Sequence, residues 1–143
     1  MIKKRWLISI LAALTFSCQN DYYDDPIPQR PVDFEINVND PLYFNLHTVN
    51  YVYLDGLGMG VRGIILYKQG NDQYLAFERT CSFQPTDPCA NLDVDPSGQY
   101  IVDACCGSIF NFHGDPIGGP AVRPLLQYQT ILNGNYLRIF NSL

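Results

Sequence analysis

The chain has 143 residues, of which 9 are lysine or arginine and 14 are aspartate or glutamate, so its formal net charge is −5. All 14 acidic residues follow Cys18, whereas three of the nine basic residues precede it, so the part after Cys18 carries a net charge of −8. A negative charge of this size argues against nucleic-acid binding and against electrostatic docking on anionic lipid.

A basic and apolar leader begins the chain. Lys3-Lys4-Arg5 is followed by an apolar run from Trp6 to Phe16. This run is shorter than the roughly 20 apolar residues that a membrane-spanning helix needs. Its length and its basic start are typical of a secretory signal peptide, so residues 1–17 are predicted to be an export signal.

The end of the leader, Ser17-Cys18, resembles the lipobox of bacterial lipoproteins, in the loose form seen in Bacteroidetes-type bacteria. The resemblance implies that Cys18 is diacylated and becomes the mature N-terminus. It also implies a place in the cell envelope, with a lipid anchor in the outer membrane and the protein facing the periplasm or the cell surface. The alternative is an ordinary secretory signal with an incidental cysteine.

Residues 18–32 are polar, acidic and rich in proline, with no apolar period. Such a composition is typical of an extended tether. The remaining residues, 33–143, are long enough for one domain.

The predicted domain is all-β. Its apolar residues mostly alternate with polar ones, Gly or Pro interrupts the chain every eight to twelve residues, and no stretch shows a convincing helical period. Two hairpins are indicated, by Gln69-Gly70-Asn71-Asp72 and by Asn133-Gly134. The predicted extended segments are 34–38, 42–46, 49–54, 63–67, 74–77, 99–102, 126–132 and 136–140.

Four cysteines remain in the predicted domain, namely Cys81, Cys89, Cys105 and Cys106. Export places them in an oxidising compartment, where thiols tend to pair. An even number suits two disulfides, and four cysteines allow three connectivities.

Three segments, 74–85, 105–110 and 114–125, resemble the Rieske iron–sulfur domain over roughly residues 33–142. Cys81-Ser82-Phe83 ends a strand, Cys106-Gly107-Ser108-Ile109-Phe110 follows in a second loop, and a Gly-Pro-Ala segment with a later Pro-Leu comes next. The resemblance implies a small antiparallel sandwich or barrel with two cysteine-bearing loops at one tip and a proline-containing loop over them.

The ligand set of that family is not retained. A Rieske cluster needs two thiolates on one iron and two imidazoles on the other. The positions that match the four ligands are Cys81, Phe83, Asp103 and Cys106. Phenylalanine has no donor atom, and iron–sulfur centres favour thiolate over carboxylate. We therefore expect a degenerate member without a cofactor or metal, and keep a 2Fe–2S cluster only as the alternative.

The resemblance also implies a disulfide pairing. In one branch of the family a disulfide ties the two loops together, and the matching positions are Cys89 and Cys105. Cys81 and Cys106 then face each other where the cluster would lie, and a second disulfide is expected to replace it. The second-ranked pairing is Cys81–Cys105 with Cys89–Cys106, and a vicinal Cys105–Cys106 bridge is ranked last.

The other polar residues do not indicate a metal-binding or catalytic site. Asp93, Asp95 and Asp103 lack the spacing of a calcium loop and are expected to lie in a solvated loop. His47 and His113 are expected to be exposed turn residues. No serine or cysteine has a histidine neighbour suited to nucleophilic catalysis, so no catalytic residue is predicted and the protein is not expected to be an enzyme.

Three functions remain open. The first, which we favour, is a membrane-anchored binding or structural lipoprotein on a Rieske-like scaffold. The second is an electron carrier with an atypical iron–sulfur centre or a thiol–disulfide pair. The third is a docking subunit of an oxidoreductase, with an envelope protein as its partner. Fold alone does not decide among them.

Overall fold

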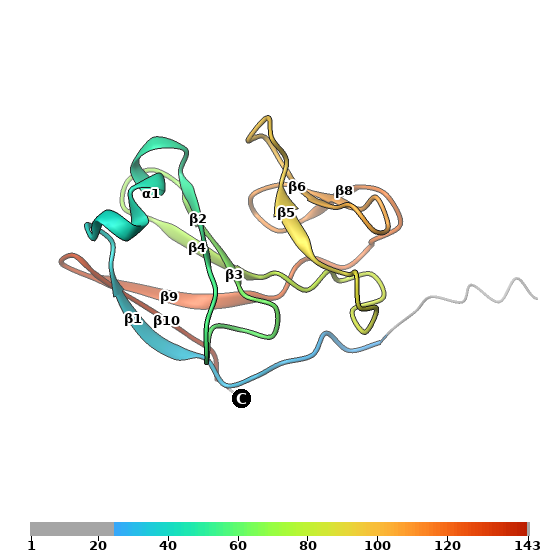
Figure 1. Cartoon of the computed structure of the whole chain (residues 1–143), viewed down its shortest axis with the longest axis horizontal. Helices are drawn as coiled ribbons and strands as arrows, with labels where there is room; N and C mark the ends of the chain where they lie inside the picture. Colours follow the sequence, from blue (N-terminus) through green and yellow to red (C-terminus); the bar gives the residue numbers. More distant parts are fainter. Residues whose placement is uncertain (1–24, 143) are drawn as a thin grey trace, which may run out of the picture.

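The computed structural model describes residues 25–142, and the predicted leader and Cys18 lie outside them. Two antiparallel sheets make up almost all of the regular structure (Figure 1). The larger sheet has the strand order β1-β10-β9-β4-β3-β2 and the smaller has the order β5-β6-β7-β8. The expectation of an all-β antiparallel fold is confirmed. The strands are β1 (Asp33–Asn37), β2 (Tyr51–Leu54), β3 (Ile64–Lys68), β4 (Tyr74–Glu78), β5 (Leu92–Val94), β6 (Ile101–Asp103), β7 (Ile109–Phe110), β8 (Pro116–Gly118), β9 (Gln127–Asn133) and β10 (Tyr136–Phe140).

One predicted extended segment is wrong. Residues 42–46 do not form a strand, because they belong to a short 3-10 helix, η1 (Pro41–Tyr43), and one turn of α-helix, α1 (Asn45–Thr48). The Asp40 side chain accepts a hydrogen bond from Leu42 N, which caps the start of η1. Of the alternating apolar residues Leu42, Phe44 and Leu46, only Leu46 is buried. The alternation therefore did not indicate a strand with one buried face.

Both predicted hairpins are present. The strands β3 and β4 pair around the turn at residues 69–73, and β9 pairs with β10 from Asn133 opposite Tyr136. Gly134 has a φ of 60°, a backbone conformation that glycine adopts without steric cost. The second hairpin places β10 between β9 and the edge strand β1.

The strands β3 and β4 contribute to two separate cores. Ile64, Leu66 and Ala76 lie in the core of the larger sheet. Ile65 and Phe77 point the other way, into a second core shared with the smaller sheet. Both faces of these strands are therefore buried, which explains the near-continuous apolar run in the sequence.

Directly after the apolar part of β4, a buried carboxylate fixes the loop before β3. Glu78 is fully buried and accepts hydrogen bonds from the backbone N of Val61 (2.7 Å) and Arg62 (2.9 Å). Its oxygens also accept from both N and Oγ1 of Thr80 and from the Tyr128 hydroxyl. Five donors thus satisfy the carboxylate, as a buried charge requires.

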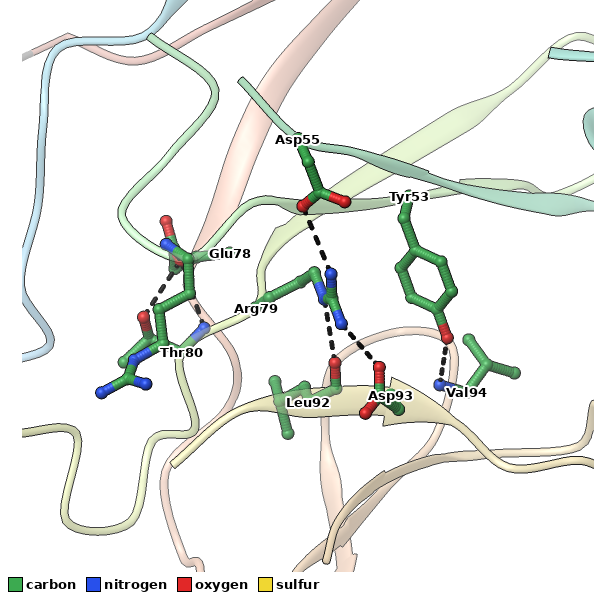
Figure 2. Close-up of polar contacts among 9 residues, drawn as sticks. Tyr53, Asp55, Glu78, Arg79, Thr80, Leu92, Asp93 and Val94 are labelled. Carbon is green, nitrogen blue, oxygen red and sulfur yellow. Dashed lines mark hydrogen bonds and ion pairs between the residues drawn. The ribbon is translucent and has the colours of Figure 1, made fainter. Parts of the chain in front are cut away.

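The next residue, Arg79, joins the two sheets (Figure 2). Its guanidinium donates to the Leu92 carbonyl at 3.0 Å and to the Asp93 carboxylate at 2.6 Å, both on β5. It also contacts Asp55 at 3.3 Å, after the end of β2, and lies over the Tyr53 ring at 4.4 Å. Because Cys81 follows two residues later, these contacts position the first cysteine-bearing segment.

The described part of the predicted tether, residues 25–32, runs along the domain to β1 (Figure 1). Val32 is 1% exposed and belongs to the core of the larger sheet. The Asp25 carbonyl accepts a 2.7 Å hydrogen bond from Arg123. Among residues 25–142, no helix has the length and apolar character needed to cross a bilayer.

Candidate functional site

Three loops meet at one end of the second core. The first follows β4 and carries Cys81, the second joins β6 to β7 and carries Cys105 and Cys106, and the third follows β8. The Ser82 hydroxyl donates to the Arg123 carbonyl at 2.7 Å, which joins the first loop to the third. Ala121 N donates to Ser108 Oγ at 3.1 Å, which joins the third loop to the second.

A disulfide links the first two loops. Cys89 is bonded to Cys105, and their Cα atoms lie 5.8 Å apart, a separation typical of disulfides. This is the pair that the resemblance implied for the inherited bridge.

The other two cysteines among residues 25–142 are thiols in this structure. The sulfurs of Cys81 and Cys106 lie 4.0 Å apart and are not bonded. Cys81 is fully buried, whereas Cys106 is half-buried and donates to Ser108 Oγ at 3.0 Å. The replacing disulfide expected between them is therefore not formed here, although the two residues do face each other.

Asp103 is not in a solvated loop, and that expectation is wrong for this residue. It ends β6 and is fully buried, whereas Asp93 on the same sheet is exposed. Its Oδ1 accepts a 2.7 Å hydrogen bond from Cys105 N. No donor among residues 25–142 is hydrogen-bonded to Oδ2. Strand β6 turns this side chain inward because Ile101, two residues earlier, faces the second core.

The local environment holds Cys81 in its protonated form. Burial raises the pKa of the Cys81 thiol far above its usual range, and the hydrogen bond from Phe83 N opposes this only in part. The neighbouring Asp103 carboxylate and Cys106 raise the pKa further. Because burial and these neighbours keep the thiol protonated, Cys81 is a poor nucleophile.

Phe83 occupies the position that matches the first histidine ligand. It is half-buried and packs against the second core, and its backbone N lies 3.5 Å from Cys81 Sγ. Three of the four matched positions do converge, since Cys81, Asp103 and Cys106 each offer a donor atom within 4.8 Å of the others. A 2Fe–2S cluster requires four ligands shared by two irons, so this donor set does not fit one.

The two histidines lie outside this set. His47 is exposed and its Nε2 donates to the Val38 carbonyl at 3.0 Å, while His113 is exposed with its Nε2 2.8 Å from the Gln69 side-chain amide. Asp87, Cys89 and Cys105 also cluster, but their two sulfurs are committed to the disulfide.

Sequence reasoning missed the residues that position the site, chiefly Glu78 and Arg79. Their signal was a charged pair immediately after the apolar run of β4. In the sequence, Ser108 is only part of a segment that resembles the Rieske domain, yet its hydroxyl contacts both Cys106 and the third loop.

Comparisons with known proteins agree with this geometry at the level of the fold. No protein-family model matches the chain, and no curated protein matches it. A solved structure does, that of the cyanobacterial plasma membrane Rieske protein PetC3 from Synechocystis PCC 6803. The match has a TM-score of 0.53 at 22% sequence identity and covers 68% of this chain and 93% of that chain.

The fold is Rieske-like. The Rieske-like domain places its two cysteine-bearing loops together, and the chain differs from the expected ligand pattern at three positions, Phe83, Asp103 and Cys106. An identity of 22% shows the shared fold alone, so the chemistry of the site depends on the residues described above.

Proposed function

We propose that this protein is a lipid-anchored, non-catalytic module of the cell envelope that uses a Rieske-like domain for binding or support, without a 2Fe–2S cluster. The observation that carries the proposal is the donor set. Phe83 offers no ligand atom, the Asp103 carboxylate stands where the pattern has a thiolate, and the Cys106 thiol stands where it has an imidazole.

The anchor is proposed from the sequence. The leader, Ser17-Cys18 and the acidic stretch after it support a lipid on Cys18 and a location at the outer membrane. A diacyl anchor suits a strongly acidic protein, because it does not depend on attraction to anionic lipid.

Contacts within the protein join the three loops. The Cys89–Cys105 disulfide and the Ser82–Arg123 and Ser108–Ala121 hydrogen bonds tie all three loops together. A fixed tip of this kind suits a surface that contacts another envelope protein.

The test of the cluster is direct. The full-length chain, exported and purified without oxygen, is analysed for iron and acid-labile sulfide and examined by absorption and electron paramagnetic resonance. We expect no stoichiometric iron and no visible chromophore. About two irons per chain with a rhombic resonance signal would refute the proposal.

The test of the anchor uses Cys18→Ser, with Ser17→Ala as the matched control that keeps a small residue before the cysteine. Labelling with radioactive palmitate is expected for the unchanged chain and for Ser17→Ala, and to be lost with Cys18→Ser. Label that persists in the Cys18→Ser chain would contradict lipidation at this residue.

A thiol–disulfide electron carrier is the second candidate, favoured by the 4.0 Å separation of the Cys81 and Cys106 sulfurs. Oxidation would form one S–S bond and release two electrons and two protons to an acceptor protein. Titration of the full-length chain in buffers of defined thiol–disulfide potential, followed by peptide mapping, tests this alternative. A reversible Cys81–Cys106 bond would support it, and thiols at every potential would exclude it.

A further inference from the structure

We propose that Cys81, Asp103 and Cys106 form a binding site for a single zinc ion. Each residue offers one donor atom, and every pair of these atoms lies within 4.8 Å. Cys81 lies in the first loop, Asp103 ends β6 and Cys106 lies in the second loop, and the Cys89–Cys105 disulfide joins these two loops. The site is therefore assembled by the fold before any ion arrives.

The buried carboxylate is the observation that points to a cation. Asp103 is fully buried, and its Oδ2 has no hydrogen-bond partner in the described part of the chain. Buried charges in proteins are paired or coordinate metals, because desolvation is otherwise uncompensated. A Cys81–Cys106 disulfide would leave this oxygen without a donor, whereas a cation bound between the sulfurs and the carboxylate would satisfy it.

The sulfur separation suits one metal ion. Two sulfurs bonded to a tetrahedral zinc at about 2.3 Å each lie roughly 3.8 Å apart. The Cys81 and Cys106 sulfurs are 4.0 Å apart, so they need to move little to share an ion. A disulfide requires about 2.05 Å and a larger movement of both side chains.

The donor types select the class of ion. Two sulfurs and one carboxylate oxygen suit zinc, whereas calcium and magnesium prefer sites made of oxygen atoms. Binding would release the two thiol protons, so that two thiolates and one carboxylate hold the ion. Cys106 is half-buried, which leaves room for water or a partner's side chain as the fourth ligand.

This site goes beyond the proposed function and does not depend on the lipid anchor. It shares with the proposed function the conclusion that the donor set does not fit a cluster. Different results would refute the two proposals. A bound iron–sulfur cluster would refute both the proposed function and the zinc site, whereas the finding that the protein binds neither iron nor zinc would refute only the zinc site.

The experiment uses the full-length chain, stripped of metal with a chelator under anaerobic conditions and without reductant, so that Cys89–Cys105 stays bonded. Zinc binding is measured by equilibrium dialysis. Cobalt is added in parallel, because thiolate ligands give it a charge-transfer absorption. We expect one zinc ion per chain and a cobalt–thiolate band that zinc abolishes.

Two variants identify the ligands. Asp103→Asn keeps the acceptor for Cys105 N but removes the charge, and Cys106→Ser removes a half-buried thiol. Each should weaken zinc binding by more than the roughly 10- to 100-fold that changing a residue next to a ligand costs. Asp95→Asn is the matched control, because Asp95 also accepts a backbone hydrogen bond two residues ahead, from Ser97 N at 2.9 Å. It should bind zinc like the unchanged chain.

Circular dichroism confirms that each variant is folded, and Cys106→Ser alone decides the question if Asp103→Asn does not fold. Three results would overturn the proposal. They are absence of zinc binding, unchanged binding in Cys106→Ser, and a Cys81–Cys106 disulfide in peptide maps of the protein isolated from the periplasm.

Discussion

The Tyr128 hydroxyl on β9 donates a 2.7 Å hydrogen bond to Oε2 of Glu78 at the end of β4. Tyr128 is 2% exposed and Glu78 is fully buried. The two residues are 50 positions apart in the chain. Glu78 itself lies three residues before Cys81. The carboxylate that orders the loop before β3 is thereby also tied to the middle of the larger sheet.

Removing this hydroxyl should destabilise the domain. Tyr128→Phe removes one of two donors to Oε2 of the buried Glu78 carboxylate and leaves Val61 N as the other. A hydrogen bond to a charged group contributes about 1.5–3 kcal/mol. Urea unfolding should show a loss of this size in the free energy of unfolding. Tyr136→Phe is the matched control, since Tyr136 is 52% exposed, and it should change stability by less than about 0.5 kcal/mol. Equal losses in the two variants would contradict the role given to Tyr128.

The same contact predicts a dependence on alkaline pH. Burial, and then the Glu78 carboxylate, raise the pKa of Tyr128 well above its usual value. The unfolded chain then loses this proton near pH 10 while the folded chain keeps it, so the contribution of Tyr128 is complete below pH 10 and declines above it. The stability difference between the unchanged chain and Tyr128→Phe should therefore shrink from about pH 10 upward. A difference that grows over this range would be inconsistent with a raised pKa.

Arg79 should be more important to stability than its surface ion pairs suggest. Arg79→Lys removes the planar donor set that reaches both Leu92 O and the Asp93 carboxylate. We expect a loss of about 1–3 kcal/mol in chemical unfolding, because the side chain is only 14% exposed. Asp55→Asn tests the weaker contact, at 3.3 Å to a residue that is 60% exposed, and should cost less than about 1 kcal/mol. A larger loss of stability in Asp55→Asn than in Arg79→Lys would contradict the role given to the Arg79 contacts with β5.

Gly119 should not tolerate a side chain. Its φ is +80°, and a Cβ atom would overlap the Gly107 carbonyl and Ser108 Cα in the second loop. Gly107 has a similar φ of +76° but no atom near the place of its Cβ. Gly107→Ala should therefore cost only the backbone strain of about 1–2 kcal/mol, and Gly119→Ala should cost clearly more and separate the loops. Thermal unfolding compares the two, and similar melting temperatures would contradict the close approach.

The Cys89–Cys105 bridge should stabilise the domain by limiting the unfolded chain. For a loop closed over 16 residues, the expected contribution is about 3 kcal/mol. The double variant Cys89→Ser/Cys105→Ser should lose about this amount in urea unfolding, and added reductant should then have no further effect on it. An unchanged free energy of unfolding would show that the bridge does not constrain the unfolded state.

Much of the fold follows from local sequence. The strand pairs β3–β4 and β9–β10 were predicted because turn residues separate apolar segments, and these pairings depend on residues close in the chain. Residues 42–46 were mistaken for a strand, because an alternating pattern does not reveal whether its apolar residues are buried. Leu42 and Phe44 are 77% and 63% exposed, and the cap by Asp40 decided the local structure instead.

Residue type and order alone predicted the all-β class, the four cysteines of the domain and the departures from the Rieske ligand pattern at Phe83, Asp103 and Cys106. The burial of Asp103 beside two thiols, with no donor to its Oδ2 among residues 25–142, is visible only in the folded domain. The same is true of the contacts by which Glu78 and Arg79 hold the first loop in place. The physical reason is that burial and donor distances arise between strands far apart in the chain. The alternation of apolar and polar residues along a strand indicates which face of the sheet each residue lies on, but it does not indicate which residues pack against that face.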